Sequence, residues 1–243
     1  MQQSDFESRR LRGFIKQLLW SHCRIPFRTI YGIPTALLKH IDRAKPLKLI
    51  DIGAHQGAFT RGLGFYCQIS GALLIEPQPD KANQMKRIFQ PPRYQVVEGA
   101  VSSTTGTAAF HVHKYDATSS LLAFAKNMPE LTALDTSVRT TFQCRTFSLD
   151  ELASATGFDD AGLVKIDVQG AEHLVLQGAK RFLNQTAKIW IEISFKPLYE
   201  ASATFFDVYQ CLYDRGFKLV EIEPGFRAPN GELLQADALF AKV

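Results

Sequence analysis

Residues 47–60 read LKLIDIGAHQGAFT, and this stretch decides the fold expected for the 243-residue chain. An apolar run ends in the acid Asp51, and two glycines follow at Gly53 and Gly57. The pattern predicts a strand, a tight loop and the start of a helix, because glycine allows a sharp turn and lets the backbone approach a ligand closely. The free N–H groups at the start of such a helix bind polar or anionic atoms. The stretch therefore predicts the seat of a nucleotide-type cofactor.

The spacing of the glycines narrows the class of cofactor. A dinucleotide-binding loop has the pattern G-x-G-x-x-G, whereas the position two residues after Gly53 is His55. The acid Asp51 at the end of the first strand suits a cofactor that carries an ammonium group better than one that carries a pyrophosphate. The amino-acid end of S-adenosylmethionine has such an ammonium group. A βα turn that binds no ligand is the alternative for this loop taken alone.

Length and composition favour one large α/β domain in the cytoplasm. The chain has 46% hydrophobic and 21% charged residues, which is enough for a substantial core. No apolar stretch reaches the length that spans a bilayer, and charged residues precede the first apolar run, unlike an ordinary secretory signal. The 4 cysteines include no C-x-x-C pair. We therefore expect reduced thiols rather than a zinc ribbon or a disulfide framework.

Residues 1–46 are expected to form an N-terminal helical extension, followed by the catalytic domain at 47–243. Positive charge gathers in the extension, at Arg9, Arg10, Arg12, Lys16, Arg24, Arg28, Lys39, Arg43 and Lys45. Apolar residues recur at helical spacing over 6–20 between several of these charges, which predicts a basic amphipathic helix. Docking on its own domain and peripheral contact of residues 1–45 with an anionic membrane surface are both consistent with this pattern.

The rest of the chain alternates predicted strands and helices, which is typical of a parallel α/β sheet. Strands are expected at 72–75, 94–97, 144–147, 163–167, 188–193, 217–222 and 236–241. Helices are expected at 35–44, 56–66, 80–89, 204–215, after a cap at Ser148 and after residue 172. A strand at 107–113 predicts a β-hairpin insertion, and residues 114–140, with a helix-like part at 122–134, form either a lid over a site or a plain surface insertion. The last strand should pair antiparallel, so the expected sheet is mostly parallel and seven-stranded.

Acidic residues end the apolar strands, at Asp51, Glu76, Glu98, Asp167 and Glu192. Ligands of open parallel sheets bind beyond the carboxyl ends of the strands. Since an acid buried there without a ligand is costly, the set predicts a site. Glu76 is placed to accept hydrogen bonds from the cis-diol of a ribose. Asp167 faces the reactive end of the cofactor and is the first candidate for general base or substrate anchor.

Several short segments occur in order and at sensible spacing: DIGAHQG at 51–57, IEPQP at 75–79, EGAV at 98–101, TSSL at 118–121, FSLDEL at 147–152, VKIDVQGAE at 164–172 and IEIS at 191–194. Together they resemble the FkbM family of S-adenosylmethionine-dependent methyltransferases over about residues 47–243. The resemblance implies the class I, Rossmann-like methyltransferase fold and O-methylation. It also implies cofactor contacts at the glycine loop, Glu76 and the turn after the third strand. The chain departs from the family at His55, where Asn is usual, and at Glu98-Gly99, where Asn is common at the first position.

These inferences define the candidate site. The candidate catalytic residues are Asp167, Glu172 and His113. The residues expected to bind S-adenosylmethionine are Asp51, Gly53, His55, Gly57, Phe59, Thr60, Glu76, Pro77, Glu98, Gly99, Ala100 and Asp167. Asp167 is favoured over Glu172, which lies one helical turn further on, and two histidines on one strand face, His111 and His113, more often pack than react. Mg²⁺ held by Asp167 and Glu192 is not expected, since an oxygen-ligand site needs a further dedicated ligand.

The expected activity is transfer of a methyl group to a hydroxyl of a sugar, glycoconjugate or natural product. The sulfonium methyl is already activated, so the protein mainly aligns a nucleophilic oxygen and removes its proton. One alternative is an N- or nucleic-acid methyltransferase, although residues 167–170 lack the Asn/Asp-Pro-Pro-aromatic turn of many N-methylating sites. Another is a catalytically silent cofactor-binding scaffold. A small-molecule or glycan substrate is expected, and no nucleic acid.

Overall fold

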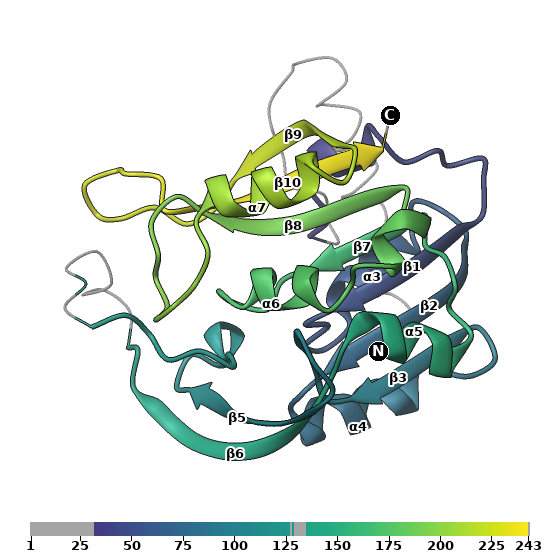
Figure 1. The fold of residues 1–243 in the computed structure, drawn as a ribbon. Helices are drawn as coiled ribbons and strands as arrows, with labels where there is room; N and C mark the ends of the chain where they lie inside the picture. Colours follow the sequence, from purple (N-terminus) through teal and green to yellow (C-terminus); the bar gives the residue numbers. More distant parts are fainter. Residues whose placement is uncertain (1–31, 127, 129–134, 243) are drawn as a thin grey trace, which may run out of the picture.

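The computed structural model describes residues 32–126, 128 and 135–242 around a seven-stranded sheet with the order β3-β2-β1-β7-β8-β10-β9 (Figure 1). The strands are β1 (Leu47–Ile52), β2 (Ile69–Glu76), β3 (Tyr94–Glu98), β7 (Leu163–Ile166), β8 (Lys188–Ser194), β9 (Phe217–Pro224) and β10 (Gln235–Lys242). Neighbouring strands pair parallel from β3 to β8. β10 is antiparallel to both β8 and β9. The mostly parallel sheet with an antiparallel last strand is confirmed.

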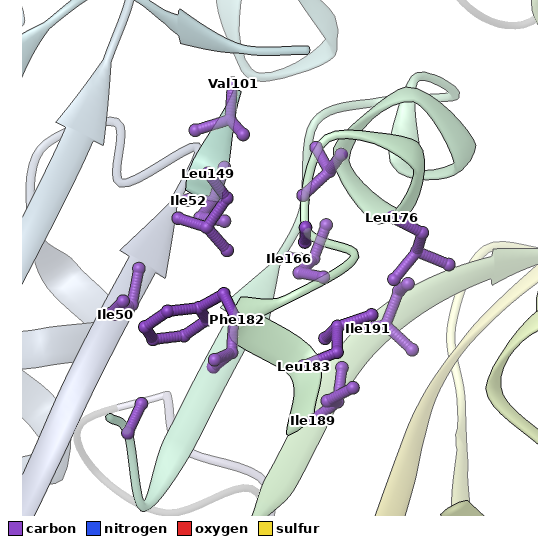
Figure 2. Close-up of a cluster of buried hydrophobic side chains, with 14 of the residues drawn as sticks. Ile50, Ile52, Val101, Leu149, Ile166, Leu176, Phe182, Leu183, Ile189 and Ile191 are labelled. Atoms are coloured by element: carbon purple, nitrogen blue, oxygen red, sulfur yellow. The ribbon is translucent and has the colours of Figure 1, made fainter. Parts of the chain in front are cut away.

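The central strands are buried on both faces, which is why they read as continuous apolar runs. On one face, Ile50 and Ile52 of β1 pack with Ile166 of β7 and Ile191 of β8, and Phe182 covers them from outside the sheet (Figure 2). On the other face, Leu49 of β1 belongs to a second cluster. The two clusters hold the carboxyl ends of these strands at one common edge.

Helices cover both faces of the sheet. They are α2 (Thr35–Leu38), α3 (Ala58–Leu63), α4 (Pro79–Ile88), α5 (Leu149–Thr156), α6 (Glu172–Gln177) and α7 (Phe205–Tyr213), with short 3-10 turns η1 (Asp116–Thr118) and η3 (Phe182–Gln185). Residues of α5, α6 and α7 belong to the first cluster, and residues of α2, α3 and α4 to the second. Ser148 caps α5 as predicted, since its hydroxyl accepts a hydrogen bond from the N–H of Glu151 at 3.3 Å.

A second, three-stranded sheet with the order β4-β6-β5 lies beside the main one. It consists of β4 (Ala100–Val101), β5 (Gly106–His113) and β6 (Val138–Phe147), and β5 and β6 form the predicted antiparallel insertion. Residues 144–147, expected as a strand, are the end of β6 and belong to this second sheet. Local alternation identifies a strand but not its partner, which depends on residues far away in the sequence.

Two predicted helices differ from the structure. The helix expected at 35–44 ends at Leu38, where the N–H of His40 donates to the carbonyl of Leu37 at 3.0 Å and departs from the helical i→i−4 pattern. Further on, the Asp42 carboxylate accepts the N–H of Ala44 at 3.0 Å and holds the chain in a turn. In the segment expected to be helix-like, residues 122–126 form no helix. Instead, the N–H of Ala125 donates to the carbonyl of Leu198 at 2.9 Å.

The predicted N-terminal extension is described only from residue 32. Its residues Ile33 and Leu37 belong to the same hydrophobic cluster as Leu49 of β1, so this part packs on the sheet. The amphipathic helix expected at 6–20 lies outside the described residues. No helix in the described part of the chain is long and apolar enough to cross a membrane.

Candidate active site

A cavity of about 220 Å³ opens at the carboxyl ends of β1, β2, β3 and β7. The main sheet contributes the inner wall, including the predicted site residues Gly53, His55, Glu76, Pro77, Gly99, Ala100 and Asp167. The outer wall comes from the insertion, with Phe110 of β5 and the segment around η1. The cavity lies where the strand order reverses between β1 and β7, which is where open α/β sheets bind their ligands.

Glu76 places a carboxylate at the end of β2, where it is 3% exposed. One carboxylate oxygen, Oε2, accepts the N–H of His55 at 2.8 Å, and Oε1 accepts the N–H of Gln78 at 3.0 Å. Burial raises the pKa of Glu76, and the two backbone donors partly offset this effect. Since each carboxylate oxygen has two lone pairs, Glu76 can still accept hydrogen bonds from a ligand.

The glycines of the opening stretch are required by packing within the protein. Gly53 has φ +73°, and a Cβ there would lie 1.8 Å from the carbonyl oxygen of Asp167. Gly57 has φ +69°, and a Cβ there would lie 2.3 Å from the ring of Phe89. The first glycine therefore lets the loop after β1 pass close to the end of β7, and the second lets α3 begin against α4.

A buried lysine connects the two acids at the ends of β1 and β7. The Nζ of Lys165 lies 3.3 Å from Oδ1 of Asp51 and 3.5 Å from Oδ2 of Asp167. It also donates to the carbonyl oxygen of Gly53 at 2.8 Å, and Thr60 donates its hydroxyl to Asp51 at 2.7 Å. Burial alone lowers the pKa of Lys165, but the two carboxylates outweigh it and hold the pKa above its ordinary value. Asp51 is fully buried in this arrangement and does not line the cavity.

Asp167 belongs to a hydrogen-bonded group at the cavity, and its side chain is 40% exposed. The amide nitrogen of Gln169 donates to Oδ1 of Asp167 at 2.8 Å and to Oε2 of Glu192 at 3.1 Å. The amide oxygen of Gln169 accepts the hydroxyl of Tyr199 at 3.1 Å, and Gln235 donates to Glu192 at 2.9 Å. Burial, followed by repulsion from Asp167, raises the pKa of Glu192 well above its ordinary value.

The other two candidate catalytic residues do not line the cavity. Oε1 of Glu172 accepts the N–H groups of Val168 at 3.1 Å and Gly170 at 3.2 Å, so this carboxylate holds the loop that carries Asp167. Burial raises the pKa of Glu172 to about 7. His113 is fully buried, with Nδ1 2.7 Å from the carbonyl oxygen of Thr118. Burial lowers the pKa of His113, which favours the neutral imidazole.

The remaining predicted cofactor contacts also lie outside the cavity lining: Gly57, Phe59, Thr60 and Glu98. The ring of Phe59 lies 6.0 Å from Nζ of Lys165. The carboxylate of Glu98 is 42% exposed and 3.6 Å from Nζ of Lys86. In the described part of the chain, no group of three or more His, Cys, Asp or Glu side chains is arranged to hold a metal ion.

A family model described as the Methyltransferase FkbM domain matches residues 51–219. This chain belongs to the FkbM family. The FkbM methyltransferases depend on S-adenosylmethionine, so the coarse activity expected from the sequence is supported. The 2-O-methyltransferase NoeI of Sinorhizobium fredii is 26% identical to this chain over 202 residues, which cover 80% of each protein.

Solved structures show the same fold. The FkbM methyltransferase of Methylobacillus flagellatus matches with a TM-score of 0.51 and 15% identity, over 79% of this chain and 43% of that chain. This chain thus spans less than half the length of that relative. A putative S-adenosylmethionine-dependent methyltransferase from Listeria monocytogenes matches with a TM-score of 0.50 and 9% identity, over 85% of this chain and 96% of that chain. The fold is the class I, Rossmann-like methyltransferase fold.

Sequence reasoning missed the ion pair that joins the two walls of the FkbM cavity. The Nζ of Lys81 in α4 lies 2.8 Å from Oδ2 of Asp116 in η1, and Nε2 of His55 lies 3.5 Å from Oδ1 of the same residue. The Lys81 side chain is only 5% exposed. Neither Lys81 nor Asp116 ends a strand, and they meet only because the insertion folds back over the sheet. The segment TSSL at 118–121 is the nearest sequence signal to this outer wall.

Proposed function

We propose that this FkbM methyltransferase transfers the methyl group of S-adenosylmethionine to a hydroxyl group of a sugar or glycoconjugate. The observation that carries the proposal is the carboxylate of Asp167, which is 40% exposed and lines the same cavity as Glu76. One acid is thus available to a substrate and the other to a cofactor. Similarity to a 2-O-methyltransferase supports oxygen as the methyl acceptor.

The cavity residues fit the cofactor. The buried carboxylate of Glu76 suits the two hydroxyls of a ribose, since it has acceptor capacity left after its backbone bonds. Ile75, Ala100 and Val101 provide an apolar wall for the adenine base, and Phe110 provides an aromatic side chain from the insertion. When bound, the cofactor supplies a sulfonium methyl group that is activated toward a nucleophilic oxygen.

Asp167 acts on the acceptor. One of its oxygens is held by the amide of Gln169 and the other lies near Lys165, so the carboxylate is fixed in place. Its exposed lone pairs accept a hydrogen bond from the acceptor hydroxyl and align the oxygen for in-line attack. The Asp167 carboxylate would take up the proton that the hydroxyl loses as its oxygen receives the methyl group, and would later release it to water. The methyl group's bond to sulfur would break in the same transfer, leaving S-adenosylhomocysteine.

Replacing Glu76 by Ala is expected to weaken binding of S-adenosylhomocysteine by roughly 10- to 100-fold, because a hydrogen bond to a charged group is worth about 1.5–3 kcal/mol. Glu76→Gln keeps one carbonyl acceptor and should lose less. Isothermal titration calorimetry measures the dissociation constants of both variants for S-adenosylhomocysteine, with Glu221→Gln on β9 as the control. An unchanged dissociation constant in Glu76→Ala would remove this carboxylate from the cofactor site.

Binding should also depend on pH. Burial raises the pKa of Glu76, so its carboxylate takes up a proton at a higher pH than an exposed glutamate does. Affinity for S-adenosylhomocysteine should therefore be full above this raised pKa and fall as the pH is lowered through it. Calorimetric titrations with S-adenosylhomocysteine between pH 8 and pH 5 measure the affinity of the wild type and of Glu76→Gln. The affinity of the variant should lack this pH dependence.

The central experiment supplies the protein with S-adenosylmethionine carrying a radioactive methyl group and a panel of methyl glycosides of neutral, amino and acidic sugars. The expected result is labelled O-methyl sugar from at least one glycoside and equimolar S-adenosylhomocysteine. Label on an amine or a nucleic acid, or tight cofactor binding without turnover on any hydroxyl acceptor, would contradict the proposal. Asp167→Asn serves as the matched inactive protein.

A further inference from the structure

We infer that Tyr199 is a positioning residue of this site, because its hydroxyl fixes the side-chain amide of Gln169, which in turn holds the carboxylate of Asp167. The inference rests on the proposed function for its kinetic consequence, but the orientation of the amide can be tested without turnover. Tyr199 comes from the segment between β8 and α7, and Gln169 from the loop between β7 and α6.

The amide of Gln169 has only one orientation that suits its neighbours. Its nitrogen donates to Asp167 and Glu192, and its oxygen accepts from Tyr199. If the amide were turned over, its oxygen would face two carboxylates and its nitrogen would face the tyrosine hydroxyl. Both N–H donors are already used in the observed orientation, so each contact depends on the others.

The hydroxyl of Tyr199 has one proton and two acceptors within reach. The carbonyl oxygen of Thr118 lies at 3.0 Å and the amide oxygen of Gln169 at 3.1 Å. The Thr118 carbonyl already has a donor, because Nδ1 of His113 lies 2.7 Å from it and a carbonyl can only accept. The carbonyl therefore keeps a donor when the tyrosine proton goes to Gln169, whose amide oxygen has no other donor among the described residues. Burial keeps the pKa of Tyr199 above its ordinary value, so the hydroxyl retains that proton.

The ring of Tyr199 is held independently of its hydroxyl. It is 2% exposed and stacks on Phe124, with 4.5 Å between the ring centroids and 18° between the planes. On another side it packs on Gly170, where a Cβ would lie 2.6 Å from the ring. Gln169 itself has φ +58°, a left-handed conformation that few residues other than glycine adopt. Removing the hydroxyl should therefore change the hydrogen bond while the ring stays in place.

Charge explains why the amide is needed at this point. Asp167, Glu172 and Asp237 all face Glu192 closely enough to raise its pKa, and the one cation next to Asp167 in the described part of the chain is Lys165. A neutral group that donates two hydrogen bonds separates Asp167 from Glu192 without adding charge. A carboxylate in the place of the amide would add to the repulsion, and it could donate a hydrogen bond only after taking up a proton.

The first test is the variant Tyr199→Phe, with Tyr213→Phe on the exposed side of α7 as its control. Loss of one hydrogen bond worth about 0.5–1.5 kcal/mol should lower kcat by roughly 3- to 10-fold on the best glycoside of the panel. The dissociation constant for S-adenosylhomocysteine should stay within about twofold, since Tyr199 does not line the cavity. Tyr213→Phe should match the wild type. Wild-type kcat in Tyr199→Phe would overturn the inference.

The second test is the variant Gln169→Glu. Its readout is the pH optimum for methyl transfer, which would not change if Gln169 only stabilised the fold. The introduced carboxyl group can replace the amide donor only when protonated, so the pH optimum for methyl transfer should shift to lower pH than in the wild type. An unchanged optimum would count against the inference. Melting curves for both variants establish that they are folded. If Tyr199→Phe does not fold, the pH optimum of Gln169→Glu still tests the inference.

Crystal structures of the wild type and Tyr199→Phe separate this inference from the proposed function. In the variant, the side-chain amide of Gln169 should shift from its wild-type position, or the Asp167 carboxylate should rotate away from it. Both groups unmoved would overturn the inference even if the enzyme is an active sugar methyltransferase. If the wild type transfers no methyl group to any hydroxyl, the proposed function fails, and the structures still decide the role of Tyr199.

Discussion

Replacing Asp167 by Asn is expected to lower kcat for methyl transfer by about 10²- to 10⁴-fold, the usual contribution of a general base. Asparagine has nearly the same shape and keeps an oxygen that can accept a hydrogen bond from the acceptor hydroxyl. It cannot take up the proton that this hydroxyl must lose. Steady-state kinetics with the labelled cofactor measure the loss, and the Michaelis constant for the glycoside should change much less than kcat.

The control for this variant is Asp160→Asn, in an exposed acid whose carboxylate pairs with Lys48. It should retain wild-type kinetics. Calorimetry with S-adenosylhomocysteine shows whether Asp167→Asn still binds the cofactor and is therefore a folded enzyme. If kcat in Asp167→Asn stays within about threefold of the wild type, far less than general-base catalysis contributes, the base assignment is wrong.

The largest effect on stability is expected from Lys165→Met, which should lower the free energy of unfolding by about 3–5 kcal/mol. Methionine fills a similar volume but leaves the fully buried carboxylate of Asp51 without its cation. For a chain of this length, the melting temperature should fall by roughly 6–20 °C. Differential scanning calorimetry at neutral pH measures both quantities.

The matched control is the double variant Lys165→Met with Asp51→Asn, which removes both members of the buried pair. Because the cost of the single variant comes mainly from a stranded charge, the double variant should be more stable than Lys165→Met alone. A double variant that loses the sum of the two single effects would show that the ion pair contributes nothing beyond packing.

The acids at the strand ends could be predicted because a parallel sheet brings the carboxyl ends of its strands to one edge. Asp51, Glu76, Asp167 and Glu192 follow apolar runs in the sequence, and the structure places them all at that edge. Their separate surroundings could not be predicted in the same way. Asp51 is fully buried, whereas the side chain of Asp167 is 40% exposed, and the difference depends on how the glycine loop and the insertion pack over them.

The contacts that cross between distant segments account for the rest. Lys165 follows two buried residues in an apolar strand, and a buried lysine nearly always has a partner, so the sequence holds a hint of its role. Asp116 gives no comparable hint, since it lies in a polar insertion and meets Lys81 only in the folded protein. The strands that pair with 138–147 could not be predicted from the local sequence pattern either. Strand pairing depends on which segments meet in the folded protein, and these segments are far apart in the sequence.

The residues that line the cavity all lie between positions 52 and 169, whereas Glu192, Tyr199 and Gln235, which support Asp167 from the other side, come from the last part of the chain. The lining of the cavity and the support of Asp167 are thus encoded by separate parts of the chain. A substitution at Glu192 or Gln235 would reach the cavity through the amide of Gln169.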